Sequence, residues 1–150
     1  MKYLITGATG NLGEKVTRWL RTMTPENNIR VGIHNLKKAN KFDDLDVEKV
    51  KLDYFDLDTL EKAVSGVDLV IYIPSITYDL QRRITEFENV LQAVKKAKAK
   101  LIFVSFFADQ ENNPFVMSPF YAYVPRRLAS SNVEYSIVKN SLYADPLVPY

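Results

Sequence analysis

A glycine-spaced turn near the start of the chain constrains the fold more than any other feature. The apolar segment 2–6 runs straight into Gly7, Gly10 and Gly13. An apolar pattern of helical spacing follows it: Leu12, Val16, Trp19 and Leu20. We expect these four side chains to form one stripe that packs on a sheet. At such a junction the free N–H groups and the dipole of the first helical turn attract an anion, and glycine lets it approach the backbone.

The order of strand, turn and helix therefore predicts a site for the pyrophosphate of a dinucleotide. The residues expected around the phosphates are Gly7, Thr9, Gly10, Asn11 and Leu12. Gly13 would instead allow the helix to pack closely on the turn. The alternative is a glycine turn without a ligand.

Apolar strand patterns alternate with amphipathic helical patterns along the chain. The predicted strands are residues 3–6, 29–33, 47–52, 69–73, 101–105 and 135–139. This alternation is typical of a parallel sheet with right-handed crossovers and helices on both faces. Six strands predict an α/β doubly wound sheet of order 3-2-1-4-5-6, the Rossmann arrangement.

Three further helices are predicted. The first is marked by Leu57, Leu60 and Val64, and Asp56 or Asp58 would be its N-cap. The second carries apolar side chains on one side: Leu80, Ile84, Phe87, Val90, Leu91, Val94 and Ala97. Its lysine-rich end, 95–100, is interpreted as a solvated last turn rather than a basic binding patch. The third, between 121 and 131, would begin near Ser118, and Pro125 predicts a kink or a later start.

The composition excludes several kinds of protein. With 150 residues, 47% hydrophobic and 25% charged, the chain is expected to be one soluble globular domain. A net charge of +2, with both signs interspersed, argues against a nucleic-acid partner. Cysteine is absent and His34 is the only histidine, so no metal site is expected. No signal peptide or membrane-spanning apolar run is seen, and we expect a cytoplasmic protein without membrane association.

In a doubly wound sheet the ligand lies across the carboxyl ends of the strands, so residues just past each strand are candidate cofactor ligands. After the second strand these are His34, Asn35 and Lys37. No acid stands there for a ribose hydroxyl, and basic residues suit the extra phosphate of NADP, so NADP is favoured and NAD is the alternative. Lys37, with its neighbours Lys38 and Lys41, could equally be an exposed helix start. His34 either donates to the 2′-phosphate or is simply exposed.

The segments after the third, fourth and fifth strands supply the other candidates. Asp53 offers an acceptor and Tyr54 an aromatic plane for adenine, although Asp53 could equally cap the next helix. Residues expected over the middle of the cofactor are Ile73, Pro74 and Ser75. Ser105 and Phe106 are expected at the nicotinamide end.

Several segments together resemble the NmrA-like family of atypical short-chain dehydrogenases/reductases, especially its NAD(P)H quinone oxidoreductase-like group. The segments are T-G-A-T-G-N-L-G at the first turn, L-D-Y-F-D, I-P-S and F-V-S at the ends of strands three to five, and L-A-S-S-N-V-E-Y-S-I-V-K-N-S-L-Y near the end. The resemblance covers essentially all 150 residues. It implies an NAD(P)-binding Rossmann domain over 1–150, NADPH-dependent reduction of a quinone or similar small acceptor, and a substrate site bordered by Phe106, Asn140 and Tyr143. The arginine that holds the 2′-phosphate in that family is replaced here by His34.

Two departures from the family pattern leave the function open. The Tyr-x-x-x-Lys proton donor has no match in register; Tyr123 and Arg127 have the right separation, but their register is wrong. Besides an oxidoreductase, the chain could be a dinucleotide-sensing regulator that binds a protein partner; a nucleotide-sugar epimerase normally needs the missing pair. The family's C-terminal substrate lobe is also expected to be absent, which would expose apolar surface and favour self-association into a homo-oligomer.

Overall fold

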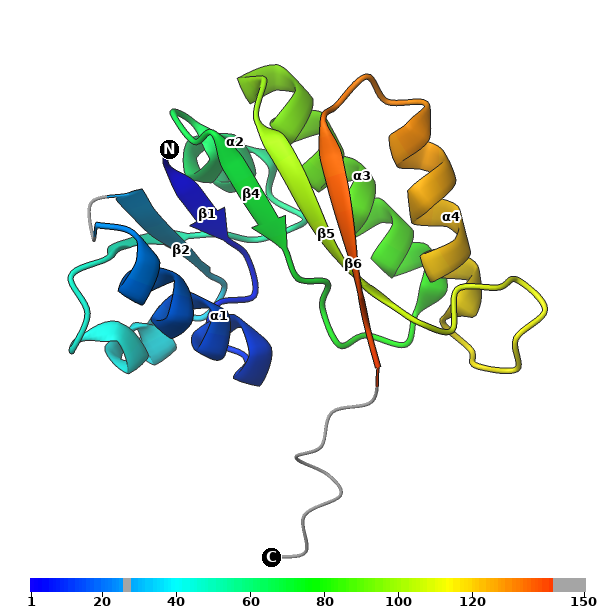
Figure 1. Cartoon of the computed structure of the whole chain (residues 1–150), viewed down its shortest axis with the longest axis horizontal. Coiled ribbons are helices and arrows are strands. Elements are labelled where there is room, and N and C mark those ends of the chain that lie inside the picture. Colours follow the sequence, from blue (N-terminus) through cyan, green and yellow to red (C-terminus); the bar gives the residue numbers. More distant parts are fainter. Residues whose placement is uncertain (26–27, 142–150) are drawn as a thin grey trace, which may run out of the picture.

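A computed structural model describes residues 1–25 and 28–141 as a six-stranded sheet with helices on both faces (Figure 1). The strands are β1 (Tyr3–Ile5), β2 (Ile29–Ile33), β3 (Glu48–Lys51), β4 (Leu69–Tyr72), β5 (Lys100–Phe106) and β6 (Tyr135–Asn140). Their order is β3-β2-β1-β4-β5-β6, and every neighbouring pair is parallel. The predicted doubly wound fold is confirmed, and each predicted strand end lies within one residue of the observed one.

The helices divide between the two faces of the sheet. They are α1 (Asn11–Met23), the 3-10 helix η2 (Leu36–Phe42), α2 (Leu57–Val64), α3 (Leu80–Ala97) and α4 (Ser118–Ala129). Successive residues of a strand face opposite sides, so Leu4 belongs to the core under α2, α3 and α4, and Ile5 to the core under α1 and η2. The carboxyl ends of β1 to β4 therefore lie at one edge of the sheet, between the helices that pack on its two faces.

The prediction that Trp19 packs on the sheet is wrong. Trp19 is 69% exposed, whereas the buried positions of α1 are Gly13 and Thr17. The Thr17 hydroxyl donates to the Gly13 carbonyl oxygen at 2.7 Å. Helix α1 must come close to the glycine turn, so it meets the sheet through its small residues, with Val16 and Leu20 beside them. In this orientation of α1, the side chain of Trp19 faces the solvent.

The helix ends agree with most of the predicted signals. Of the two candidate N-caps for α2 the structure uses Asp56, whose carboxylate accepts the N–H groups of Asp58 and Thr59. Lysines fill the last turn of α3, and Lys96 pairs with Glu61 at 2.6 Å, as expected for a solvated helix end. Helix α4 begins at Ser118 and continues through Pro125, so the later start is wrong. No helix within 1–25 and 28–141 is long and apolar enough to cross a membrane.

Candidate functional site

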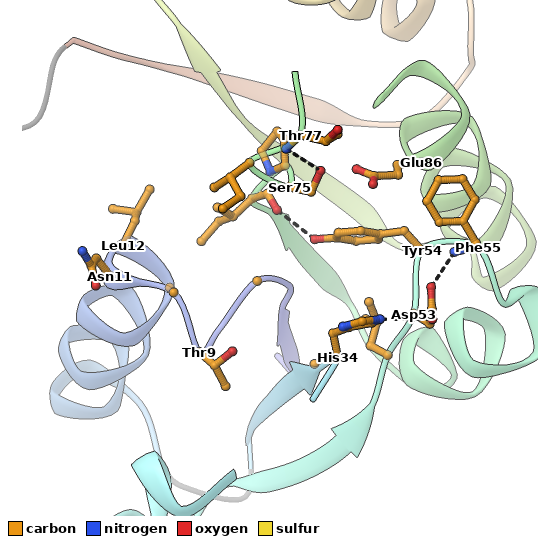
Figure 2. A pocket seen from close by; sticks show the side chains of 18 of the residues that line it. Thr9, Asn11, Leu12, His34, Asp53, Tyr54, Phe55, Ser75, Thr77 and Glu86 are labelled. Atoms are coloured by element: carbon orange, nitrogen blue, oxygen red, sulfur yellow. Dashed lines mark hydrogen bonds and ion pairs between the residues drawn. The ribbon is translucent and has the colours of Figure 1, made fainter. Parts of the chain in front are cut away.

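A cavity of about 750 Å³ lies over the carboxyl ends of β1 to β4 (Figure 2). This volume lies within the range of about 300–1,000 Å³ that is usual for small-molecule sites. The predicted cofactor residues that line it are Gly7, Thr9, Gly10, Asn11, Leu12, His34, Asp53, Tyr54, Ile73, Pro74 and Ser75. The chain thus brings segments from four crossovers around one space.

The glycine turn forms one wall of the cavity with its backbone. Gly7 has φ +60°, a conformation that favours glycine, and the Gly10 N–H donates to the Gly7 carbonyl at 3.0 Å. Gly10 is the N-cap of α1 and has no side chain to cap the helix. The first-turn N–H groups of α1 therefore lack a side-chain acceptor at the cavity wall, where a helix N-terminus favours an anion.

His34 and Asp53 meet at the ends of β2 and β3. His34 Nε2 lies 3.2 Å from Asp53 Oδ2, and the side chain of His34 is 75% exposed. The other carboxylate oxygen, Oδ1, accepts the Phe55 N–H at 2.9 Å. That backbone donor lowers the pKa of Asp53, and His34 adds to the effect. Asp53 does not cap α2, which Asp56 does, so it remains a carboxylate at the cavity wall.

Tyr54 is anchored rather than free. Its hydroxyl lies 2.8 Å from both Thr6 Oγ1 and the Ile73 carbonyl oxygen. The ring meets Tyr72 edge-on at 5.6 Å between centroids. Burial raises the pKa of Tyr54, so its hydroxyl stays protonated as a hydrogen-bond donor. Tyr54 therefore holds the β4 loop in place while its ring faces the cavity (Figure 2).

The cavity also has lining residues that the sequence did not predict as site residues, among them Phe55, Arg82 and Glu86. Arg82 places its guanidinium 4.3 Å from the centroid of the Phe55 ring. Glu86, in α3, is 3% exposed and points toward Ser75 (Figure 2). Burial raises the pKa of Glu86, and a hydrogen bond with Ser75 opposes this.

A sequence signal for this charged group existed, because Arg83 and Glu86 fall on the inward side of α3. Arg83 is also buried and donates to the Thr77 carbonyl oxygen at 2.6 Å and to the Tyr121 hydroxyl at 3.2 Å. Position 83 precedes the apolar residues Phe87 and Val90 by one and two helical turns, so its charge interrupts the buried stripe. Charged residues inside such a stripe mark a polar site or an internal network.

Several other predicted site residues lie outside the cavity lining. Asn35 accepts the Lys37 N–H at 3.1 Å and so caps η2, and neither residue lines the cavity. Ser105 is buried in β5, and Phe106 packs among the aromatic rings of Phe107, Phe115 and Tyr121. Asn140 pairs with Phe106 in the β5–β6 register, and its carbonyl accepts the Phe107 N–H at 2.9 Å. Tyr143 lies outside the described residues.

The tyrosine and arginine with dyad spacing are engaged elsewhere. The Tyr123 hydroxyl donates to Glu88 at 2.7 Å, and Arg127 Nε donates to the same carboxylate at 2.9 Å. These contacts link α4 to α3, and none of the three residues lines the cavity. In the described part of the chain, no three His, Asp or Glu side chains are grouped so that they could hold a metal ion.

A doubly wound sheet with a glycine turn at its first crossover, and an open cavity over that turn, defines a Rossmann-type nucleotide-binding domain. The NmrA-like family model matches residues 1–143, and the chain belongs to that family.

Among known proteins, the chain is 28% identical over 141 residues to quinone oxidoreductase 2 of Escherichia coli (strain K12), covering 94% of this chain and 49% of the relative. The solved structure of a nucleoside-diphosphate-sugar epimerase from Staphylococcus aureus is 36% identical with a TM-score of 0.91, covering 98% of this chain and 53% of that one. Triphenylmethane reductase of Citrobacter sp., solved as a complex with NADP(H), is 29% identical with a TM-score of 0.90, covering 99% and 52%. The chain therefore spans about half the length of these proteins.

Proposed function

We propose that this chain binds NADP(H) and supports NADPH-dependent reduction of a quinone or a similar small acceptor. The observation that carries the proposal is the open cavity at the N-terminus of α1, where no side chain caps the helix. An NADP(H) complex of the similar triphenylmethane reductase and the similarity to a quinone oxidoreductase support both parts of the proposal.

The cofactor would run across the strand ends from β3 to β5. Its pyrophosphate would meet the backbone of Gly7 and Gly10, and the middle of the cofactor would pass under the loop 73–75. The adenosine half would lie between His34 and Tyr54. We propose His34 as the donor to the 2′-phosphate, since its exposed ring lies at the end of β2 and can donate to an anion there.

The reacting end would lie beyond the cavity, toward the carboxyl end of β5. The bound cofactor supplies the hydride, and the chain binds it, orients it and positions the acceptor. Ser105, Asn140 and Tyr143 remain proposed contacts at that end. The aromatic cluster around Phe106 offers ring faces to a flat acceptor such as a quinone.

Two measurements test this proposal. Titration with NADPH and NADH, followed by cofactor fluorescence or calorimetry, should show saturable binding with NADPH the tighter ligand. Addition of a panel of quinones to protein and NADPH should then remove the NADPH absorbance. An absence of binding would refute the cofactor site, and binding without turnover on any quinone would refute the proposed reaction.

The engagement of Tyr123 and Arg127 by Glu88 favours a second candidate, a regulator that binds the dinucleotide without consuming it. Such a protein would bind its protein partner only with, or only without, NADP(H). A partner interaction that does not respond to the cofactor would rule this candidate out.

The proposal also includes the cell compartment of the protein. We place it in the cytoplasm, because a chain of 150 residues without cysteine suits a reducing compartment.

Self-association is proposed through exposed apolar side chains that follow β4 and β5: Ile76, Tyr78, Phe107 and Val116. Light scattering over a range of concentrations would detect it.

A further inference from the structure

Glu86 is a buried carboxylate with an unused acceptor. Its side chain leaves α3 at the end of the cavity formed by Tyr54, Ser75 and Thr77 (Figure 2). The oxygen Oε2 has no hydrogen-bond partner in the described part of the chain. Oε1 lies 3.9 Å from the Nε of Arg82. A hydrogen bond with Ser75 offsets part of the cost of burying this carboxylate, and a ligand that supplies a further donor would stabilise it.

The neighbouring side chains make hydrogen bonds to other groups, and none of them donates to Oε2. The two terminal nitrogens of Arg83 donate to the Thr77 carbonyl oxygen and to the Tyr121 hydroxyl, whereas its buried Nε has no hydrogen-bond partner in the described part of the chain. The hydroxyl of Tyr54 is held between Thr6 and Ile73. No group of the described part of the chain donates to Oε2, so a molecule in the cavity can supply that donor.

The topology indicates which part of a dinucleotide reaches this end. The glycine turn places the pyrophosphate beside β1, and the two nucleosides extend from it in opposite directions along the strand ends. The cavity includes His34, Asp53 and Phe55 from the β2 and β3 side, and it does not include Ser105 or Phe106 from β5. Its end near Glu86 therefore belongs to the adenosine half, beyond the ribose.

Asp53 is the other acid at this end, and it is less available than Glu86. One of its oxygens accepts the Phe55 N–H at 2.9 Å, and the other lies 3.2 Å from His34 Nε2. Glu86 retains a complete acceptor at Oε2. A base that offers an N–H donor would satisfy Glu86, whereas one that offers an oxygen at the same place would be repelled.

We propose that Glu86 is a specificity-determining residue that accepts a hydrogen bond from the amino group of the purine, so that the cavity selects adenine over a 6-oxo purine. This inference rests on the proposed NADP(H) site and adds a residue and a base preference to it. The oxygen Oε2, which has no partner in the described part of the free protein, gains one when the dinucleotide binds.

The experiment compares the affinities of NADPH and of its hypoxanthine analogue, which carries an oxygen in place of the adenine amino group. Dissociation constants are measured by cofactor fluorescence for the wild-type protein, Glu86→Gln, Asp53→Asn and Glu88→Gln. Glu88→Gln is the matched control, because Glu88 lies on the same helix and outside the cavity. We expect the wild-type protein to prefer NADPH by about tenfold, the change that corresponds to one unsatisfied polar group.

Glu86→Gln should reduce this preference to about twofold, because an amide can rotate to meet either base. The Glu88→Gln and Asp53→Asn variants should keep the wild-type preference. A wild-type protein that binds both nucleotides equally, or a Glu86→Gln variant that keeps the full preference, overturns the inference. If only the Asp53→Asn variant loses the preference, Asp53 is the residue that binds the amino group, and this result also overturns the inference. If neither nucleotide binds the wild-type protein, the proposed function itself fails.

Discussion

A β-carbon on Gly13 would lie 2.2 Å from the carbonyl oxygen of Gly7, much closer than any two such atoms approach. The two residues belong to the helix and the turn that frame the cavity. Their contact explains both the depth at which α1 sits on the sheet and the face that it presents, because only a position without a side chain can stand there.

Replacement of Gly13 by alanine should destabilise the fold strongly. The new methyl group would collide with the backbone of Gly7 and Ala8, so α1 must move away from the sheet. We expect a loss of about 3 kcal/mol in the free energy of unfolding, measured by urea denaturation. Gly10→Ala is the control, since the nearest atom to a β-carbon there is 3.3 Å away; an equal loss in both variants would contradict this account.

Gly10→Val tests the phosphate site without rebuilding the fold. Gly10 has φ −78°, which a valine can adopt, but its methyl groups would project from the N-cap of α1 where phosphate oxygens are expected. NADPH affinity should fall by about 100-fold or more, equivalent to about 3 kcal/mol, with little change in the melting temperature. Unchanged affinity in the titration would refute the assigned role of the turn.

His34→Ala should weaken the preference for NADPH over NADH. A charge-assisted hydrogen bond to the 2′-phosphate would be lost, and the ratio of the two affinities should drop by about tenfold. The control is Lys37→Ala, because Lys37 does not line the cavity. A larger drop of this ratio in the Lys37 variant would show that the 2′-phosphate binds at η2 and not at the end of β2.

Tyr123→Phe should leave NADPH oxidation nearly unchanged. Its hydroxyl is bonded to Glu88 between α3 and α4, away from the cavity, so its removal should lower the free energy of unfolding by about 1 kcal/mol. Steady-state kcat/KM with a quinone acceptor and a thermal melt measure the two effects. A large drop in kcat without loss of stability would make Tyr123 a proton donor after all.

Glu86→Gln should stabilise the free protein as the pH rises. Burial raises the pKa of Glu86 from its reference value of 4.5, so ionisation of this group disfavours the folded state. Below the reference pKa the wild-type protein and the Glu86→Gln variant both carry a neutral side chain at this position and should have similar stability. As pH increases through the raised pKa the wild type loses stability relative to the variant, and the difference then stays constant. Urea unfolding at several pH values measures it, and a wild type that gains on the variant with rising pH would contradict the assignment.

Much of this architecture could be predicted from local patterns. The alternation of apolar strands and amphipathic helices predicted six parallel strands in the observed order, since right-handed crossovers allow few other arrangements. The glycine spacing located the wall of the cavity. In both cases the signal depends on backbone geometry and residue period, which neighbouring residues along the chain determine.

Contacts between distant segments decided the rest. Trp19 follows the apolar pattern of α1 yet faces solvent, because the contact between Gly13 and Gly7 sets the rotation of the helix. The spacing of α3 puts Glu86 on its inward side, but only the packing of α3 against the loop that follows β4 buries this side chain beside Ser75. Periodicity shows that a residue lies on one face of a helix; the burial and partners of its side chain depend on which segments the completed sheet brings against that face.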